Sequence, residues 1–275
     1  MDSYAVIGNP VAHSKSPQIH AAFAAQTGQQ MTYTAVLAPR DGFALAVAEF
    51  RDAGGCGLNV TVPFKQEASS VANLLSDRAS AAGAVNTLSF QGGKILGDTT
   101  DGIGLVRDLS VNLGVNLQGL RILLIGSGGA ARGVIAPVLA EKPARLAIVN
   151  RTAAKAKELA SSFARLGPIE VTSFAELHDA RFDILINATS VGLSGDALTL
   201  PDTLFTEGAL AYDMMYWTGP TPFLRQAEAA GGRIADGLGM LVEQAAESFF
   251  IWRGVRPDTR QVLSSLRAHL QVTRT

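Results

Sequence analysis

The sequence is poor in the residues from which disulfides, metal clusters and membrane spans are built. Its 275 residues include one cysteine, Cys56, which excludes an internal disulfide and a cysteine metal cluster. Lys and Arg number 23 against 24 Asp and Glu, and the net charge of −1 favours neither nucleic acid nor an anionic membrane as partner. No apolar run approaches the roughly 20 residues that span a bilayer. Because no basic and apolar leader precedes the first strand pattern, we expect a cytoplasmic protein.

A glycine-rich stretch in the middle of the chain organises the rest. The apolar run 121–125 is typical of a buried strand, and it ends abruptly at Gly126. Gly126, Gly128 and Ala131 then form the spacing G-x-G-x-x-A. The first glycine permits a tight turn, the second lets a pyrophosphate approach the backbone, and Ala131 lets the next helix pack on the strand. Free N–H groups at the start of that helix favour an anion, so the stretch predicts a dinucleotide site.

The residue that follows the second strand of this unit indicates which dinucleotide binds. The apolar run 146–149 ends at Asn150-Arg151-Thr152, and 150 − 126 = 24 positions separate its end from the first glycine. A site that prefers NAD carries Asp or Glu near this position, to accept from the ribose 2′-hydroxyl. This chain has Arg151 instead, whose guanidinium can grip a 2′-phosphate, which predicts NADP. The alternative is a surface Arg151 at the start of an ordinary helix that Thr152 caps.

The order of the remaining patterns predicts an α/β fold with two domains. Strand patterns at 4–7, 32–37 and 57–63 alternate with helices, which predicts parallel β/α units. A helix through Val71, Leu74 and Leu75 and a hairpin of 87–90 with 94–96 follow. We expect an N-terminal parallel-sheet substrate domain and a Rossmann-like NADP-binding domain, separated by an active-site cleft. The predicted bounds are 1–101 plus 237–275 for the substrate-binding and catalytic domain, and 102–236 for the NADP domain.

Small polar side chains, with one cation and one anion, follow several of the predicted strands. In open parallel sheets ligands bind beyond the carboxyl ends of the strands, so we expect these residues to gather there. The set suits a small polyhydroxylated carboxylate as ligand. Its members are Ser14, Ser16, Asn59, Thr61, Lys65, Asn86 and Asp101.

Each of these residues also has a purely structural interpretation. Ser16 precedes Pro17 and is predicted to cap the first helix, as Asp41 caps the second, and Asp101 could act in the same way. The Asn and Thr side chains could satisfy backbone groups at strand ends or turns, and Lys65 could be solvated. His13 and His20 lack the partners of a metal site, so no metal is expected. No G-x-S-x-G motif or Cys/His pairing supports a nucleophilic triad.

The order of several further motifs resembles the shikimate dehydrogenase family from Tyr4 to the last helix. The motifs are Gly8-Asn9-Pro10 with His13-Ser14-Lys15-Ser16-Pro17, Asn59-Val60-Thr61-Val62-Pro63-Phe64-Lys65, Gly83-Ala84-Val85-Asn86-Thr87, Asp98 to Gly102, Asn150-Arg151-Thr152, Asn187-Ala188-Thr189, Tyr212-Asp213-Met214 with Tyr216, Thr221-Pro222-Phe223 and Asp236-Gly237-Leu238-Gly239-Met240-Leu241. Any one of them is modest evidence, and together in this order they are highly specific.

The resemblance implies an enzyme that reduces 3-dehydroshikimate reversibly to shikimate with NADPH, in the shikimate pathway of aromatic amino-acid biosynthesis. It implies Lys65 as the catalytic lysine with Asp101 beside it, where Asp101 would favour and orient the charged lysine. Contacts to the substrate would come from Ser14, Ser16, Asn59, Thr61, Lys65, Asn86, Asp101, Tyr216 and Gln244. Contacts to NADP would come from Asp77, Gly126, Ser127, Gly128, Gly129, Ala130, Asn150, Arg151, Thr152, Lys155, Thr189, Met214 and Gly237. A monomer or homodimer without nucleic-acid or membrane partners is expected.

One position departs from the family's pattern. Thr99 stands where the usual G-D-N-T-D-G has Asn, which predicts changed hydrogen bonding in a loop beside Asp101. Because of Thr99, an aminoshikimate-type paralogue stays an alternative assignment for this sequence. A quinate/shikimate dehydrogenase that uses NAD is the nearest alternative, and Arg151 argues against it. A non-catalytic shikimate-binding regulatory protein is the alternative of another class, and the presence of both Lys65 and Asp101 counts against it.

Overall fold

The computed structural model describes residues 1–189, 191, 198–205 and 208–272, and the chain divides into two compact units. The first unit comprises Met1–Gly104 and Val242–Ser264, and the second comprises Leu105–Leu241 and Ser265–Thr275. These boundaries lie within a few residues of the predicted ones except at the C-terminus. There the chain from residue 265 joins the second unit, whereas the prediction placed it with the N-terminal domain.

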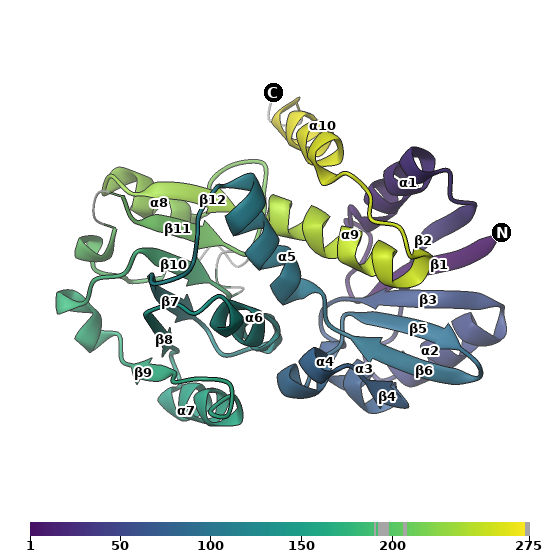
Figure 1. The fold of residues 1–275 in the computed structure, drawn as a ribbon, viewed down its shortest axis with the longest axis horizontal. Coiled ribbons are helices and arrows are strands. Elements are labelled where there is room, and N and C mark those ends of the chain that lie inside the picture. The colour runs from purple at the N-terminus through teal and green to yellow at the C-terminus, as the bar shows by residue number, and fades with distance from the viewer. Residues whose placement is uncertain (190, 192–197, 206–207, 273–275) are drawn as a thin grey trace. The chain divides into compact units, whose positions relative to one another are not determined.

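The first unit is built on a six-stranded sheet with the order β2-β1-β3-β5-β6-β4 (Figure 1). Its central strands β1 and β3 are parallel, whereas β5 pairs antiparallel with both β3 and β6. The sheet is therefore mixed, and the predicted hairpin supplies its antiparallel part. The elements of this unit are β1 Asp2–Gly8, α1 Ser16–Thr27, β2 Met31–Leu37, α2 Phe43–Asp52, β3 Gly55–Val60, α3 Lys65–Val71, β4 Leu74–Leu75, α4 Asp77–Ala82, β5 Thr87–Gln91 and β6 Lys94–Asp98.

Three local predictions in this unit are wrong. The helix expected to run through Leu75 ends at Val71, and Leu74–Leu75 form the short strand β4 beside β6. Lys15 occupies the N-cap of α1, so Ser16 is a helical residue and its side chain does not cap the helix. Gly42 occupies the N-cap of α2 in place of Asp41, without a side-chain hydrogen bond. At β4, pairing with β6 overrides the local helical pattern, and the two caps differ from the prediction by one residue.

The second unit contains a parallel sheet with the order β12-β11-β10-β7-β8-β9. Numbered from the first strand of the unit, this is the doubly wound order 3-2-1-4-5-6. The order in which strands are added to the sheet reverses between β7 and β10, and all the strands stay parallel. Helix α5, Asp101–Arg107, begins in the first unit and ends in the second. The other elements are a π-helical turn Asp108–Asn112, β7 Arg121–Ile125, α6 Gly129–Ala140, β8 Arg145–Val149, α7 Ala153–Ser162, β9 Glu170–Thr172, β10 Ile184–Asn187, β11 Leu210–Asp213, α8 Pro222–Ala229 and β12 Arg233–Asp236, with 3-10 turns at Ala175–Asp179 and Asp202–Leu204. The Rossmann-like fold predicted from the sequence is thereby confirmed.

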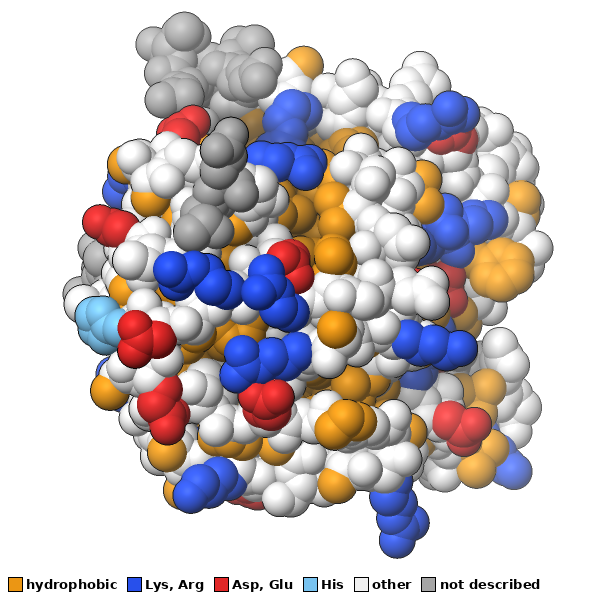
Figure 2. Space-filling view, turned by 60° about the vertical axis from the view of Figure 1, so that its left-hand side comes forward, with side chains coloured by type: hydrophobic (Ala, Val, Ile, Leu, Met, Phe, Trp, Pro, Cys, Tyr) orange, Lys and Arg blue, Asp and Glu red, His pale blue; other side chains and the backbone are white. Residues whose placement is uncertain are grey.

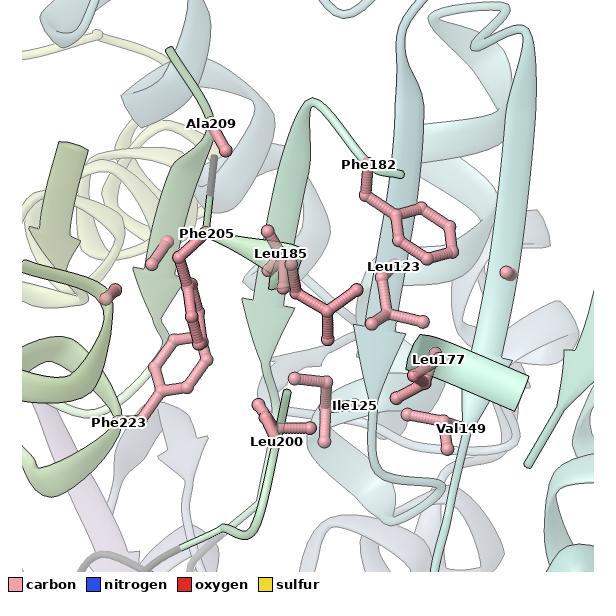
Figure 3. Packing of buried hydrophobic residues seen from close by; sticks show 14 of the residues in the cluster. Leu123, Ile125, Val149, Leu177, Phe182, Leu185, Leu200, Phe205, Ala209 and Phe223 are labelled. Carbon is pink, nitrogen blue, oxygen red and sulfur yellow. The ribbon is translucent and has the colours of Figure 1, made fainter. Parts of the chain in front are cut away.

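Apolar side chains from neighbouring strands fill one core of the second unit (Figure 3). Leu123 on β7 and Leu185 on β10 are fully buried and lie close together in this cluster. Phe205 and Phe223 pack edge to face with their ring centroids 5.8 Å apart. Burying each such side chain contributes roughly 1.5–3 kcal/mol, so this core holds the strand ends of the unit at fixed positions.

Two helices close the chain. Helix α9 covers Leu238–Arg253 and α10 covers Thr259–Val272, so each includes residues of both units. Among the residues that the structure describes, no helix combines the length and apolar character needed to cross a membrane.

His20 lies at the centre of an aromatic cluster in the first unit. Its ring stacks on Tyr33 with centroids 4.1 Å apart, and Trp252 and Phe249 lie within ring contact. The side chain is fully buried, and neither ring nitrogen has a hydrogen-bond partner among the described residues. Burial therefore lowers the pKa of His20 from 6.5 to about 3, and the folded protein keeps a neutral imidazole there.

This neutral histidine predicts a loss of stability in mild acid. Below pH 6.5 the unfolded chain binds a proton at His20 that the folded chain does not bind until the pH nears 3. The free energy of unfolding should fall by roughly 1.4 kcal/mol per pH unit over that window from this residue alone. Urea titrations of the wild type and of His20→Leu at several pH values measure the difference. His13→Leu, at an exposed position, is the matched control. Parallel pH dependence in the wild type and His20→Leu would contradict the argument.

Candidate active site

Most of the polar residues predicted for the substrate site lie along one edge of the first sheet. Strands β1 and β3 run parallel and end there, in the register Ile7 to Val60. Strand β5 runs the opposite way, so its start lies beside the end of β3, and β6 ends at the same edge. Loops that are far apart in the sequence thus bring Ser14, Thr61, Lys65, Asn86 and Asp101 to one edge.

Lys65 and Asp101 form an ion pair at this edge. Lys65 is the first residue of α3, and its Nζ lies 2.6 Å from Oδ2 of Asp101, the first residue of α5. The Asp101 side chain is 8 % exposed and that of Lys65 is 21 % exposed, so the ammonium is the more accessible partner. An ion pair with this little exposure is screened far less than a surface pair. The geometry presents a protonated amine, held by a fixed carboxylate, toward the accessible side.

Asn86 holds the other oxygen of the same carboxylate. Its Nδ2 donates to Asp101 Oδ1 at 2.9 Å and lies 3.2 Å from Gln244 Oε1 on α9. Its Oδ1 accepts from the backbone N–H of Thr100 at 2.9 Å. A backbone N–H can only donate, so the atom that faces it must be the amide oxygen. The orientation of the Asn86 amide is thereby fixed, with its NH₂ group toward Asp101. The structure therefore brings Asn86, Asp101, Lys65 and Gln244 together as one hydrogen-bonded group.

The loops after β1 and β3 lie against each other. A Cβ on Gly8 would lie 2.3 Å from Thr61 Cγ2, so only glycine permits this approach. The backbone N–H of Asn9 donates to the Val62 carbonyl at 3.0 Å. In the first of these loops, Ser14 Oγ accepts from the backbone N–H of Ser16 at 3.3 Å. Ser14, Ser16 and Thr61 are thus carried on two loops that are tied together.

The remaining predicted substrate and first-unit residues occupy different surroundings. Asn59, on β3, is buried and donates from Nδ2 to the Asn86 carbonyl at 3.1 Å, so it supports the site from beneath. Asp77 is an exposed first residue of α4 in the first unit. Tyr216 belongs to the second unit, after β11, where burial raises the pKa of its phenol. Their predicted ligand contacts stay predictions.

In the second unit, the predicted dinucleotide turn leaves β7 at Gly126. Gly126 has φ of +111°, which glycine adopts readily, and its Cα faces the loop after β10, with Thr189 Cγ2 3.0 Å from an added Cβ. A Cβ on Gly128 or Gly129 would meet no atom of the described residues within 4 Å. Packing within the chain therefore does not explain the missing side chains at 128 and 129, whereas a ligand against this backbone would. Helix α6 begins at Gly129, and its N-cap, Gly128, offers no side chain to its N–H groups.

Arg151 and Lys155 follow β8 at the same sheet edge, because Val149 is in register with Ile125. Both side chains are exposed, and neither makes a hydrogen bond or ion pair with another residue that the structure describes. Asn150 Nδ2 donates to the Thr152 carbonyl at 3.0 Å, which shapes this turn. Figure 2 shows Lys and Arg side chains interspersed with Asp and Glu side chains over the face that it presents. Exposed cations at this edge are therefore available as individual side chains, and Arg151 is one of them.

The buried carboxyl group of Asp213, to which the sequence analysis gave no role of its own, links the loops after β10 and β11. Asp213 accepts from Thr221 Oγ1 at 2.6 Å, from the Met215 N–H at 3.0 Å and from Asn187 Nδ2 at 3.2 Å. Burial raises the pKa of Asp213 above its ordinary value. Asn187 Oδ1 in turn accepts from the hydroxyl of Thr189 at 2.7 Å. This network fixes the segments that carry the predicted cofactor residues Thr189 and Met214.

Gly237 is held at the end of β12 by a close backbone approach. A Cβ there would lie 2.2 Å from the Met214 carbonyl oxygen, and its N–H donates to the Met215 carbonyl at 3.0 Å. All predicted cofactor residues except Asp77 thus lie beyond the carboxyl ends of the second sheet.

Sequence reasoning missed three buried hydroxyl residues beneath the first site, Thr87, Thr100 and Ser248. All three are inaccessible to solvent. Thr87 and Thr100 lie within motifs that the sequence singled out, but β-branched residues at strand ends are ordinary and carry no separate signal. Ser248 occupies an interior position of α9, where nothing in the sequence distinguishes it.

The fold and the two sets of residues define the class of protein. A doubly wound parallel sheet with a glycine turn and an uncapped helix N-terminus is the architecture of a dinucleotide-binding unit. The chain adds to it the first unit, an α/β unit that carries a partly buried lysine–carboxylate pair among hydroxyl and amide groups. This is the class of two-unit, dinucleotide-dependent enzymes.

Comparisons with known proteins identify the family within this class. Three family models match the chain: the shikimate dehydrogenase substrate binding domain over 6–88, the shikimate/quinate 5-dehydrogenase over 109–193, and the shikimate 5'-dehydrogenase C-terminal domain over 237–267. A shikimate dehydrogenase (NADP(+)) of Dechloromonas aromatica is 63 % identical over 270 residues, which are 98 % of both chains. The chain therefore belongs to the shikimate dehydrogenase family.

Solved structures agree with this placement. An Ael1 enzyme from Pseudomonas putida is 47 % identical, with a TM-score of 0.93 over 97 % of this chain and 98 % of the other. A shikimate 5-dehydrogenase from Thermus thermophilus, solved with NADP(H) and shikimate, is 34 % identical, with a TM-score of 0.86 over 98 % of this chain and 99 % of the other.

Proposed function

We propose that this chain is an NADP-dependent shikimate dehydrogenase, which reduces the ketone of 3-dehydroshikimate reversibly to the alcohol of shikimate. The observation that carries the proposal is the 2.6 Å contact between Lys65 Nζ and Asp101 Oδ2 at a sheet edge lined with hydroxyl and amide groups. Relatives between 53 % and 63 % identical over nearly the whole chain bear the name shikimate dehydrogenase (NADP(+)). We assign substrate binding to the first unit and cofactor binding to the second.

The chemistry asks the protein to manage one proton and one developing charge. Bound NADPH would supply the hydride that adds to the carbonyl carbon. As the C=O π bond breaks, negative charge grows on the oxygen, and the ammonium of Lys65 is suited to stabilise that charge. The Lys65–Asp101 pair, acting as a unit, delivers the proton that completes the hydroxyl group. In the reverse direction the same pair accepts the proton from the alcohol.

The chain's residues fit the proposed cofactor. Open space over Gly128 and Gly129 and the uncapped start of α6 suit a pyrophosphate. Arg151 is exposed without a partner among the described residues, and it suits a 2′-phosphate. Thr189, Met214 and Gly237 would line the same edge of the sheet, as would Asn150, Thr152 and Lys155.

Initial rates of shikimate oxidation with NADP⁺ and NAD⁺ in parallel, repeated with quinate, test the proposal. We expect strong activity with shikimate and NADP⁺ alone. Comparable rates with NAD⁺ or quinate would favour the quinate/shikimate branch of the family. Shikimate binding without turnover by any pair would favour the non-catalytic alternative. We further propose that the enzyme acts in the cytoplasm as a monomer or homodimer.

Removing the lysine should abolish most of the turnover. We expect Lys65→Ala to lower kcat by roughly 10²-fold or more, because the proton donor and the cation at the oxygen are both lost. The affinity for NADP⁺ should stay nearly intact. Steady-state rates and NADP⁺ titrations provide the measurement, and Lys94→Ala, at an exposed hairpin position, is the control. Turnover near the wild-type level in Lys65→Ala would refute the catalytic assignment.

Removing the arginine should change the preference between cofactors. We expect Arg151→Ala to weaken NADPH binding by about tenfold or more, because paired charge-assisted hydrogen bonds to a 2′-phosphate are lost. NADH lacks that phosphate and should bind almost as before. Dissociation constants for both cofactors give the comparison, with the exposed Arg165→Ala as control. Equal losses for NADPH and NADH would remove the argument for a 2′-phosphate contact.

A further inference from the structure

A chain of buried side chains leads to Asp101 from the opposite side of the first unit, and its hydrogen bonds run in one direction. We propose that Thr87 and Ser248 are positioning residues at the middle of this chain, which begins at Tyr33 and ends at the carboxylate of the catalytic pair. The inference deepens the proposed dehydrogenase function and rests on it. Neither residue is predicted to touch substrate or cofactor.

The direction of the first half of the chain follows from groups that cannot change roles. Asn59 Nδ2 lies 3.1 Å from the Asn86 carbonyl, which only accepts, so the amide of Asn59 must face it with nitrogen. Asn59 Oδ1 then accepts from the hydroxyl of Tyr33 at 2.8 Å. The same Nδ2 donates to Ser248 Oγ at 2.9 Å.

The second half is fixed by the amide of Asn86. Because Asn86 Oδ1 only accepts, the Thr87 hydroxyl donates to it at 2.9 Å and has no second hydrogen. In the 2.9 Å contact between Ser248 Oγ and Thr87 Oγ1, Thr87 is therefore the acceptor, and Ser248 shares its one hydrogen between Thr87 and the Gln244 carbonyl at 3.1 Å. Thr87 Oγ1 also accepts directly from Asn59 Nδ2 at 3.2 Å. Asn86 Nδ2 completes the chain by donating to Asp101 Oδ1 at 2.9 Å. The donors Tyr33, Asn59, Thr87 and Asn86 thus all point toward the carboxylate, and Ser248 forms a side branch between Asn59 and Thr87.

Burial makes this arrangement consequential. Thr87 and Ser248 are fully buried, and Asn59, Asn86 and Asp101 are nearly so. Successive hydrogen bonds of one direction polarise each other, and a low local dielectric strengthens each of them. A polar group left unpaired here is costly, so the Asn86 amide has one favoured orientation. The chain therefore fixes the Asp101 carboxylate, and through it the ammonium of Lys65.

Paired substitutions of Thr87 test the proposal. Thr87→Val has nearly the same shape and lacks the hydroxyl, whereas Thr87→Ser keeps the hydroxyl. We expect kcat for shikimate oxidation to fall about tenfold in Thr87→Val, the effect of one buried hydrogen bond, and to stay within about threefold of the wild type in Thr87→Ser. The KM for NADP⁺ should change little in either. Thr32→Val, on the exposed face of β2, is the control.

A double substitution separates a chain from two independent structural roles. Ser248→Ala should lose less than Thr87→Val, because Asn59 still donates to Thr87 directly, and the combination should lose no more than Thr87→Val alone, because that substitution already breaks the chain. Losses that multiply, or Thr87→Ser as impaired as Thr87→Val, would overturn the proposal.

A measurement without substrate keeps this test independent of the proposed function. In ¹H–¹⁵N spectra of the ligand-free protein, the side-chain amide resonances of Asn86 should shift in Thr87→Val and Ser248→Ala and stay in place in Thr87→Ser. If the wild type lacks shikimate activity while these shifts appear, the proposed function fails and the chain stands. If Thr87→Val does not fold, Tyr33→Phe removes the first donor at a half-buried position. Unchanged Asn86 resonances in the folded variants would refute the chain.

Discussion

The carboxylate of Asp101 holds two side chains that come from different segments of the first unit. One oxygen accepts from the ammonium of Lys65 on α3, and the other accepts from the amide of Asn86 before β5. Two charges with this little exposure are costly to bury unless both are held in good geometry. The mixed sheet, the hairpin and the start of α5 all serve to place these three side chains within hydrogen-bond distance.

The second unit offers backbone N–H groups, rather than paired charged side chains, to its proposed ligand. An anion needs backbone N–H groups that nothing else uses, and the turn at Gly126 with the bare glycines after it provides them. Under the proposed function, its specificity would depend on a few side chains at neighbouring strand ends, with Arg151 as the charged one. The buried carboxyl group of Asp213 ties the ends of β10 and β11 together.

Sequence patterns were sufficient for the features that depend on local periodicity. The glycine turn, the doubly wound sheet and the hairpin were predicted because apolar runs and turn residues mark them directly. The strand β12, at Arg233–Asp236, was not predicted, since it is short and only partly buried. The grouping of Lys65, Asn86 and Asp101 was anticipated from strand ends and from family motifs. The roles of Thr87, Ser248 and Asp213 required the structure, because a buried hydrogen-bond partner can lie far away in the sequence, as Ser248 does from Asn59.

The six strands of the second sheet end in register. On one side of β7, Ile125 pairs with Val149, and Val149 pairs with Thr172. On the other side, Ile125 pairs with Asn187, and the row continues through Asp213 to Asp236. One residue inserted into β10 would move its terminal loop by about 3.3 Å and turn Asn187 to the opposite face of the sheet. An insertion or deletion should therefore disturb this edge least in the turns at the amino ends of the strands. The carboxyl ends of the strands must stay level with one another, whereas the segments that connect the strands can differ in length.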